Sequence, residues 1–200
     1  MNDLTRMEFW SADRRPAAIR PAGEFAAIVT SDRLPDAVDA VLETGGRVVA
    51  ALQNDELIGY ASIVRPSPVR WMGRLLARRW DDLDGLVELG ALEVARAYRG
   101  KGLGSRIASA IVEDKRLEEA VLFGIGVVHH WDLRWSSRSP LAHRRVLSAT
   151  VRHAGMSSWP TDDPEITMHP ANALFARVGP RVAPSLREAF EGKLQGRNAC

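Results

Sequence analysis

The chain has 200 residues, of which 46% are hydrophobic and 26% charged, as in an ordinary globular protein. Its formal net charge of +2 is too small to indicate a nucleic acid or a membrane surface as the main partner. The lone cysteine, Cys200, excludes an intrachain disulfide and a cysteine-based zinc site. The chain starts without the basic-then-apolar order of a signal peptide and contains no apolar run long enough to span a membrane. These features predict a single domain over 1–200 and a cytoplasmic location.

The N-terminal part is expected to hold a flexible arm and two helices. Residues 1–16 are polar and mixed in charge, and we expect them to form the arm. Apolar residues at helical spacing over 16–30 predict a helix, interrupted by a proline and a glycine. A second helix is expected to begin between Ser31 and Pro35 and to end at Gly45.

Two segments then predict a β-hairpin. Residues 47–52 and 57–64 are rich in β-branched and apolar side chains, and the polar residues 53–56 separate them. The next stretch, 65–84, contains five arginines together with Trp71 and Trp80. It is either a solvated loop or short helix whose tryptophans pack on the body, or a surface that recognises an acidic partner or covers the active site.

The rest of the chain predicts two strands and four helices. Strands are expected at 85–94 and 120–128, and helices at 101–119, 139–154 and 183–194, with a short helix that follows residues 169–172 and ends at Gly179. The arrangement of strand, turn and helix around residue 100 is the one that carries chemistry, because it can aim several backbone N–H groups at an anion.

The turn in question reads RGKGLGS over Arg99–Ser105. It is not a P-loop, because Ala95 stands where that motif needs a glycine, and it also fails the G-x-G-x-x-G spacing of dinucleotide-binding proteins. Arg99, Gly102 and Gly104 do fit R-x-x-G-x-G. This pattern resembles the loop with which the GNAT acetyltransferases bind the pyrophosphate of acetyl-CoA.

Four further segments resemble one subfamily, the acetoin-utilisation acetyltransferases. They are ELGALEV at 88–94, HWDL at 130–133, TDDPEI at 161–166 and HPAN at 169–172. The resemblance runs from about residue 47 to 179, whereas residues 1–45 show no clear match. It implies an α/β (α+β) GNAT fold, with a mixed, mostly antiparallel central sheet that splays between two parallel strands and is flanked by helices. It also implies a protein acetyltransferase that modifies a lysine of acetyl-CoA synthetase.

The acetyl-acceptor amine must lose a proton, so a general base is expected. Glu88 is the first candidate, because it matches a position at which several GNAT protein acetyltransferases keep a glutamate. Its alternative role is that of a structural carboxylate paired with an arginine. Glu93 lies five residues further on, so an unbroken strand would place it on the opposite face, and a bulge would change that parity.

The resemblance also assigns the acetyl-CoA site. Backbone groups of Leu92 and Val94 would hold the pantetheine arm and polarise the thioester. Arg99 and Lys101 would supply positive charge to the pyrophosphate. The backbone N–H groups that would surround it belong to Gly100, Lys101, Gly102, Leu103, Gly104 and Ser105.

The expected general acid is missing. Many GNAT enzymes place a tyrosine in a late helix, and the matching residue here is Phe175, which has no proton to give. His130 could substitute for it, or could fix the end of the preceding strand. His129 and His130 point to opposite faces of a strand, so no metal is expected.

Another polar cluster either shapes the entrance for the acceptor lysine or satisfies a buried loop. It comprises Asp163, Glu165, His169 and Asn172.

The sequence therefore predicts an acetyl-CoA-dependent N-acetyltransferase acting on a protein lysine, with neither nucleic acid nor membrane as a partner. Two alternatives stay open. One is a GNAT enzyme that acetylates a small amine, and the other is a non-catalytic acyl-CoA sensor, which Phe175 would explain. Whether the chain forms a homodimer is also left open.

Overall fold

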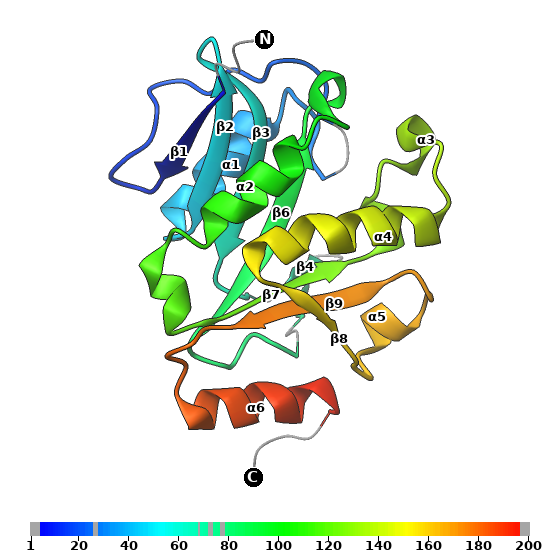
Figure 1. The fold of residues 1–200 in the computed structure, drawn as a ribbon. Helices are drawn as coiled ribbons and strands as arrows, with labels where there is room; N and C mark the ends of the chain where they lie inside the picture. Colours follow the sequence, from blue (N-terminus) through cyan, green and yellow to red (C-terminus); the bar gives the residue numbers. More distant parts are fainter. Residues whose placement is uncertain (1–4, 26–27, 68, 72–73, 77–78, 197–200) are drawn as a thin grey trace.

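The computed structural model describes residues 5–25, 28–67, 69–71, 74–76 and 79–196. Its centre is a seven-stranded sheet with the strand order β1-β2-β3-β6-β7-β9-β8 (Figure 1). The strands are β1 (Arg6–Trp10), β2 (Arg47–Gln53), β3 (Glu56–Val64), β6 (Leu86–Val94), β7 (Val121–Gly126), β8 (Ser157–Trp159) and β9 (Ala173–Val178). A separate two-stranded ribbon consists of β4 (Val69–Trp71) and β5 (Arg74–Leu76).

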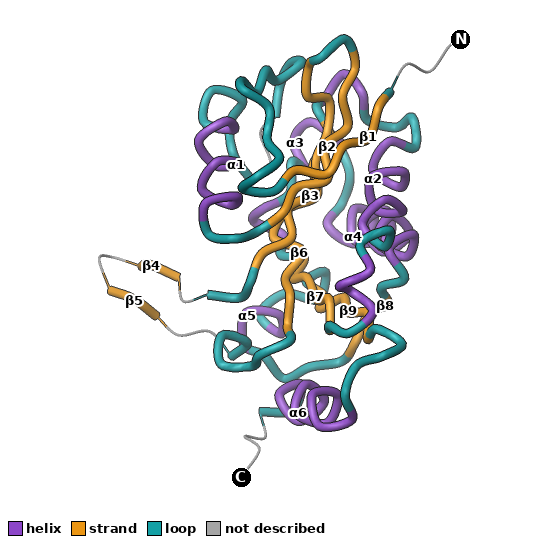
Figure 2. Tube along the Cα trace, turned by 90° about the vertical axis from the view of Figure 1, so that its left-hand side faces the viewer, coloured by secondary structure: helices purple, strands orange, loops and turns teal. Residues whose placement is uncertain are grey.

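Helices cover both faces of the sheet. They are α1 (Leu34–Glu43), α2 (Leu103–Ile111), α3 (Leu133–Ser136), α4 (Pro140–Val151), α5 (Pro164–Thr167) and α6 (Pro184–Leu194). Short 3-10 turns lie at η1 (Arg96–Tyr98), η2 (Lys115–Glu118), η3 (Val128–His130) and η4 (Arg152–Ala154). Helices α2 and α4 cover one face, and α1 and the β4–β5 ribbon lie on the other side (Figures 1 and 2). In the described ranges, every helix falls short of the length and apolar character that crossing a bilayer requires.

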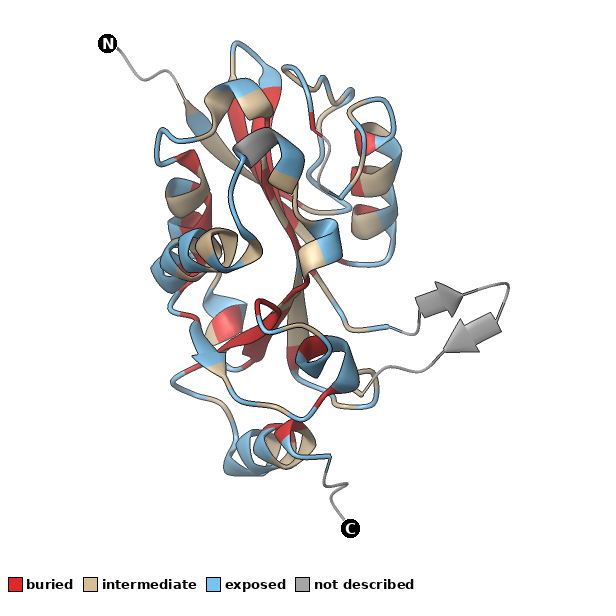
Figure 3. Ribbon diagram, turned by 90° about the vertical axis from the view of Figure 1, so that its right-hand side faces the viewer, coloured by how far each residue is buried: buried red, intermediate tan, exposed pale blue. Residues whose placement is uncertain are grey.

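The core follows from this layering, because each strand alternates its side chains between two covered faces. Buried residues run along the strands, and exposed residues along the outer sides of the helices (Figure 3). Ile107 of α2 and Leu42 of α1 are both fully buried, on opposite faces of the sheet. A third apolar cluster forms around Trp80, whose ring lies 5.3 Å from Phe123 and 5.8 Å from Phe190 of α6.

The sheet separates between its two parallel strands, as the resemblance implies. Strands β6 and β7 pair only at Leu86↔Val121, Val87↔Leu122 and Glu88↔Phe123. Beyond these pairs, β6 continues beside β3 and β7 beside β9. The remaining pairs of neighbouring strands are antiparallel, so the expected mixed sheet that splays between two parallel strands is confirmed.

A bulge in β6 decides which residues of that strand share a face. Ser62 pairs with Ala91 and Ile63 pairs with Leu89, so Gly90 is the extra residue. Residues opposite each other in the ladder point to the same side of a sheet. Glu88 and Glu93 therefore lie on the same side of the sheet, which is the side covered by α1. The bulge between them shifts the alternation of the strand by one residue.

Several local expectations are confirmed. The hairpin forms from β2 and β3 around Asn54 and Asp55, whose φ angles of 52° and 62° belong to a tight two-residue turn. Ser139 caps α4 by accepting a hydrogen bond from the Ala142 backbone N–H. Trp80 packs on the body, whereas the side chain of Trp71 lies outside the described part of the structure.

Four expectations about secondary structure are wrong. His129 and His130 lie in the 3-10 turn η3 and not on a strand, because β7 already ends at Gly126. Part of the proposed arm, Arg6–Trp10, is an edge strand paired with β2. The described residues of 16–30 form a loop instead of a helix, because the backbones of Arg20 and Ala22 hydrogen-bond to Leu57 and hold the chain extended. Residues Ala173–Val178 form a strand and not a helix, since they fill the space between β7 and β8.

Candidate active site

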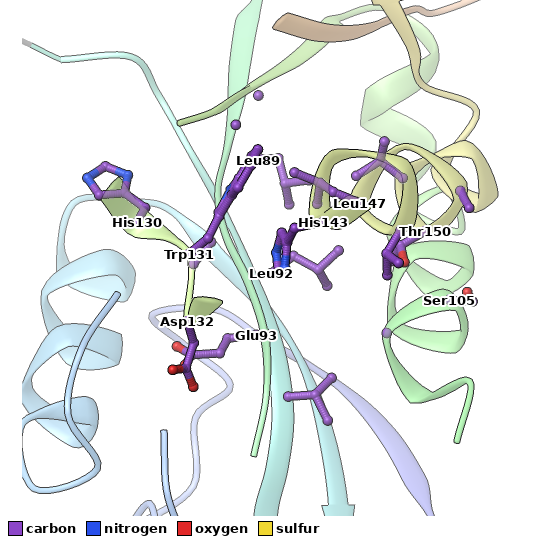
Figure 4. A pocket seen from close by; sticks show the side chains of 18 of the residues that line it. Leu89, Leu92, Glu93, Ser105, His130, Trp131, Asp132, His143, Leu147 and Thr150 are labelled. Atoms are coloured by element: carbon purple, nitrogen blue, oxygen red, sulfur yellow. The ribbon is translucent and has the colours of Figure 1, made fainter. Parts of the chain in front are cut away.

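A cavity of about 750 Å³ opens where β6 and β7 separate (Figure 4). One side is made by the second half of β6 and by the turn that follows it. The other sides come from the end of β7, from the segment around Trp131 and from the inner face of α4. The cavity thus lies at the carboxyl ends of the two parallel strands.

The glycine loop leads into α2 without a side-chain cap. Gly102 is the N-cap residue of α2 with φ +78°, and Gly100 has the same φ. A Cβ added at either glycine would have no heavy atom within 4 Å, so their role is conformational. The first backbone N–H groups of α2 receive no side-chain cap, and Leu103–Ser105 line the cavity. An uncapped helix start that borders a cavity fits a pyrophosphate group.

Gly104 lies beside α4. A Cβ there would lie 3.4 Å from Thr150 Cγ2, which is an ordinary van der Waals contact. Both Ser105 and Thr150 line the cavity where the two helices meet (Figure 4).

The two cations of the loop have separate surroundings. Lys101 is exposed, donates from Nζ to the Ala97 carbonyl at 3.0 Å and lies 5.5 Å from the centre of the Tyr98 ring. It is not among the residues that line the cavity, whereas Arg99 is.

Arg99 turns back toward β6. Its Nε donates to the Val94 carbonyl at 2.8 Å, and a terminal nitrogen donates to Asp132 Oδ2 at 2.8 Å. The other terminal nitrogen lies 3.6 Å from Glu93 Oε1. The pyrophosphate role expected for Arg99 therefore stays a prediction, and this side chain already serves three groups of its own chain.

Asp132 is bound by two arginines. Arg96 donates to both of its carboxylate oxygens, at 2.8 and 3.0 Å, and Arg99 adds the third hydrogen bond. These contacts, with those from Arg96 as the larger cause, lower the pKa of Asp132 below its ordinary value. Arg96 also pairs with Glu24, an exposed residue of the loop beside the site.

The two glutamates of β6 differ in position. Glu93 is 4% exposed and lines the cavity, beside Asp132 (Figure 4). Its partner across the ladder is Tyr60, whose pKa is raised by burial and also by the charge of Glu93. Glu88 lies on the same side of the sheet, is half-buried, and is not among the residues that line the cavity.

Two histidines border the cavity. Partial burial and the neighbouring His129 lower the pKa of His130. His143 of α4 stacks on Trp131 at 4.8 Å between ring centres, and burial is the first cause of its lowered pKa. Among the described residues, no hydrogen-bond partner exists for its buried Nδ1 atom. Both rings are therefore neutral at pH 7.

Phe175 lines the cavity from the strand β9, opposite Gly124, so its comparison with a tyrosine of a late helix does not hold in this fold. The remaining predicted residues have structural surroundings. Asn172 accepts from the Val128 N–H and donates to the Glu165 carbonyl. Asp163 and His169 each accept a backbone N–H two residues further along the chain. These three side chains therefore satisfy backbone hydrogen-bonding groups of the loops around α5.

Within the described ranges, no three histidine, cysteine, aspartate or glutamate side chains come together as a metal site would need.

Comparisons with known proteins agree with this geometry. The model of the acetyltransferase (GNAT) family matches residues 22–125, more than half of the chain. The chain belongs to the GNAT acetyltransferase family.

Members of this family named acetoin utilization protein resemble the chain over most of its length. AcuA of Bacillus subtilis is 30% identical over 192 residues, which cover 94% of this chain and 82% of that protein. AcuA of Bacillus licheniformis is 31% identical over 148 residues, covering 73% and 67%. The crystal structure of an acetoin utilization protein from Exiguobacterium sibiricum superposes with a TM-score of 0.81 at 30% identity, covering 90% of this chain and 82% of that one. The protein is therefore an acetyl-CoA-dependent N-acetyltransferase of the AcuA type.

Some residues of this GNAT site carry little or no signal in the sequence. Asp132 stands out there only as part of the HWDL segment, and its two arginine partners cannot be read from the sequence. His143 does carry a signal that was missed, because it lies four residues before Leu147 and seven before Thr150, on the inner face of a predicted helix.

Proposed function

We propose that this GNAT enzyme acetylates a lysine side chain of a protein in the cytoplasm. Acetyl-CoA synthetase is the acceptor that the resemblance to the acetoin-utilisation subfamily implies. The proposal rests on one observation, which is that the two sides of the cavity differ in chemistry. An apolar side faces α2 and α4, and a carboxylate-bearing side is formed by Glu93 and Asp132.

The donor lies in the gap between β6 and β7. Beyond Glu88, β6 no longer pairs with β7, so the backbone groups on that edge are available to the amides of a pantetheine arm. Leu92 and Val94 belong to this part of β6, and Leu103–Ser105 border the cavity at the start of α2. This supports the assignment of pantetheine to β6 and of pyrophosphate to the glycine loop.

The acceptor amine needs a base. A lysine with a pKa near 10.4 is neutral in only about four molecules in ten thousand at pH 7. Glu93 borders the cavity and is the carboxylate of β6 best placed to take the proton, and we give it the role first expected for Glu88. His130, on the same side of the cavity, is a neutral second acceptor of protons.

The lysine ammonium first gives one proton to Glu93, which passes it to solvent. The neutral nitrogen then attacks the thioester carbon, and a new C–N bond forms as the C–S bond breaks. The second proton lost by nitrogen passes to Glu93, and coenzyme A leaves as a thiolate. Its thiol pKa, about 8.5 by analogy with cysteine, makes it a fair leaving group without a dedicated acid.

The test is an acetylation assay with acetyl-CoA and purified acetyl-CoA synthetase. We expect the synthetase to gain the mass of one acetyl group on a lysine and to lose activity. Glu93→Gln should abolish the mass change while acetyl-CoA still binds, as measured by calorimetry. An unmodified synthetase, combined with release of coenzyme A in the presence of small amines, would assign the enzyme to small-molecule acetylation instead.

A further inference from the structure

Five charged side chains of alternating sign form a row that leads from the surface to the cavity. In order, they are Glu24, Arg96, Asp132, Arg99 and Glu93. The row begins with an exposed carboxylate and ends with a buried one, because the side chain of Glu24 is 63% exposed and that of Glu93 is 3% exposed. Each inner member contacts a charge of opposite sign on both sides.

Asp132 is the member that decides where Arg99 points. The Asp132 side chain is 8% exposed, and Arg96 binds both of its oxygens, so its own position is determined. From this position it accepts a hydrogen bond from Arg99, whose Nε is held by the Val94 carbonyl. These two acceptors, Asp132 and the Val94 carbonyl, orient the Arg99 guanidinium toward β6. Its remaining terminal nitrogen then lies near Glu93.

A guanidinium is a planar fork, so fixing two of its nitrogens also fixes the third. The third nitrogen of Arg99 lies 3.6 Å from Glu93 Oε1, within ion-pair distance but longer than a hydrogen bond. This contact places a positive charge beside a carboxylate that lines the cavity, where it acts on any proton transfer to that carboxylate.

We propose that Asp132 is a positioning residue for catalysis, which holds Arg99 against the base Glu93 rather than leaving it for the pyrophosphate of the donor. The inference rests on the proposed role of Glu93. It predicts that the charge at position 99 acts on the chemical step, and that the uncapped start of α2 carries most of the binding of the pyrophosphate.

The groups that face Glu93 come from four elements. Tyr60 belongs to β3, Arg99 follows η1, His130 ends η3 with Asp132 two residues later, and His143 reaches the cavity from α4. Both histidines have lowered pKa values, which disfavours their charged forms. Among the described contacts, Arg99 is the cation beside Glu93, and Asp132 is the anion that holds Arg99.

The decisive pair of variants is Asp132→Asn and Glu24→Gln. Each removes one carboxylate charge from Arg96, but only Asp132 also contacts Arg99. With acetyl-CoA synthetase as acceptor, we expect Asp132→Asn to lower kcat by about ten- to a hundredfold, because a misoriented group costs that much. Glu24→Gln should stay within about twofold of the parent enzyme, since exposed pairs contribute little.

The pH profile of kcat separates this role from a structural one. Asp132→Asn removes one of the two acceptors that hold Arg99 against Glu93, so the positive charge moves away from the base and the acid limb should move to higher pH. Arg99→Gln removes that charge altogether, so the acid limb should move further in the same direction. A loss of fold would lower kcat without shifting the acid limb, and circular-dichroism melts check that the variants remain folded.

Binding of acetyl-CoA alone, measured by calorimetry, needs no acceptor. We expect Asp132→Asn and Arg99→Gln to change its Kd by less than about threefold, well below the tenfold that 1.4 kcal/mol would give. A rise of Kd beyond tenfold for Arg99→Gln would make Arg99 a ligand of the pyrophosphate and overturn the inference. The inference is also overturned if Asp132→Asn behaves like Glu24→Gln in kcat and pH profile.

Failure of the inference is distinguishable from failure of the proposed function. If Glu93→Gln keeps its kcat with the synthetase, Glu93 is not the base and the inference falls, whereas acetylation of a protein lysine stands. If Glu93→Gln is inactive but Asp132→Asn is not impaired, only the positioning role falls. If the synthetase is not an acceptor, a crystal structure with coenzyme A decides: Arg99 bound to Asp132 supports the inference, and Arg99 bound to the pyrophosphate overturns it.

Discussion

The two sides of the cavity are built from different chemistry, although β6 contributes to both. On the α4 side, the surface consists mainly of apolar groups such as Leu92, Val146 and Leu147. On the other side lie Glu93, His130 and Asp132. Arg99, the first residue of the glycine loop, contacts both Glu93 and Asp132. An apolar side suits a pantetheine arm that must be held, and a charged side suits an amine that must lose a proton. Under the proposed function, donor and acceptor would meet at β6 and would bind on different sides of it.

We expect the largest effect on kcat from a substitution on the charged side of the cavity. Glu93→Gln should lower kcat by about a hundred- to ten-thousandfold, the range typical of a lost general base. The matched control is Glu88→Gln, which changes the same residue type on the same side of β6 but outside the cavity. Steady-state assays with the acceptor give kcat for both. If Glu88→Gln is the more damaging variant, the charged side has been assigned to the wrong glutamate.

A bulky residue on the apolar side should act on the donor instead. Leu147→Trp inserts a large ring into the gap between α4 and β6, and overpacking of this kind costs about 1–3 kcal/mol. We expect the Kd for acetyl-CoA to rise about tenfold or more by calorimetry. Leu141→Trp, on the exposed face of the same helix, should leave it unchanged. If both variants bind acetyl-CoA equally well, the donor does not bind on this side of the cavity.

The charged side also depends on a buried amide. Asn172 accepts from the Val128 N–H at the start of η3 and so fastens the segment that carries His130 and Asp132. Asn172→Ala leaves that N–H without its partner, which should cost about 1–3 kcal/mol in chemical denaturation. The exposed Glu191→Ala serves as a control for the measurement. A cost below about 0.5 kcal/mol would show that η3 is held by other contacts.

The smallest effect concerns the histidine on the apolar side. Burial lowers the pKa of His143 below the ordinary 6.5, so the unfolded chain binds its proton at a higher pH than the folded one. Stability must therefore fall as the pH drops through 6.5 and below. His143→Gln should weaken this dependence in melts between pH 7 and 5, whereas the exposed His153→Gln should not. Identical slopes for all three proteins would contradict a buried neutral imidazole.

Much of the fold was predictable because its signals are local. The glycine loop lies between a strand and a helix with clear periodicity, and Ser139 with Pro140 marks the start of α4. The edge strand Arg6–Trp10 was missed because its order comes from β2, far along the chain, and not from its own residues. The strand Ala173–Val178 was missed for the same reason.

The residues of the site were likewise predictable only where their sequence signals are local. The turn at Arg99–Ser105 was recognisable by its glycines, but the direction of the Arg99 side chain depends on Asp132, which lies 33 residues away. The placement of Glu93 depends on the bulge at Gly90, and the sequence could state only what such a bulge would do. The single-domain organisation and a homodimer both stay predictions.

The separation of β6 from β7 has a consequence for the order of events during turnover. Under the proposed function, the donor lies on one side of the β6 edge and the acceptor side chain on the other, so neither molecule has to leave before the other arrives. The acetyl group can then pass directly between them within a ternary complex, with no acetylated enzyme in between. Initial-rate plots at several fixed acceptor concentrations should show lines that intersect, whereas parallel lines would require the protein itself to carry the acetyl group.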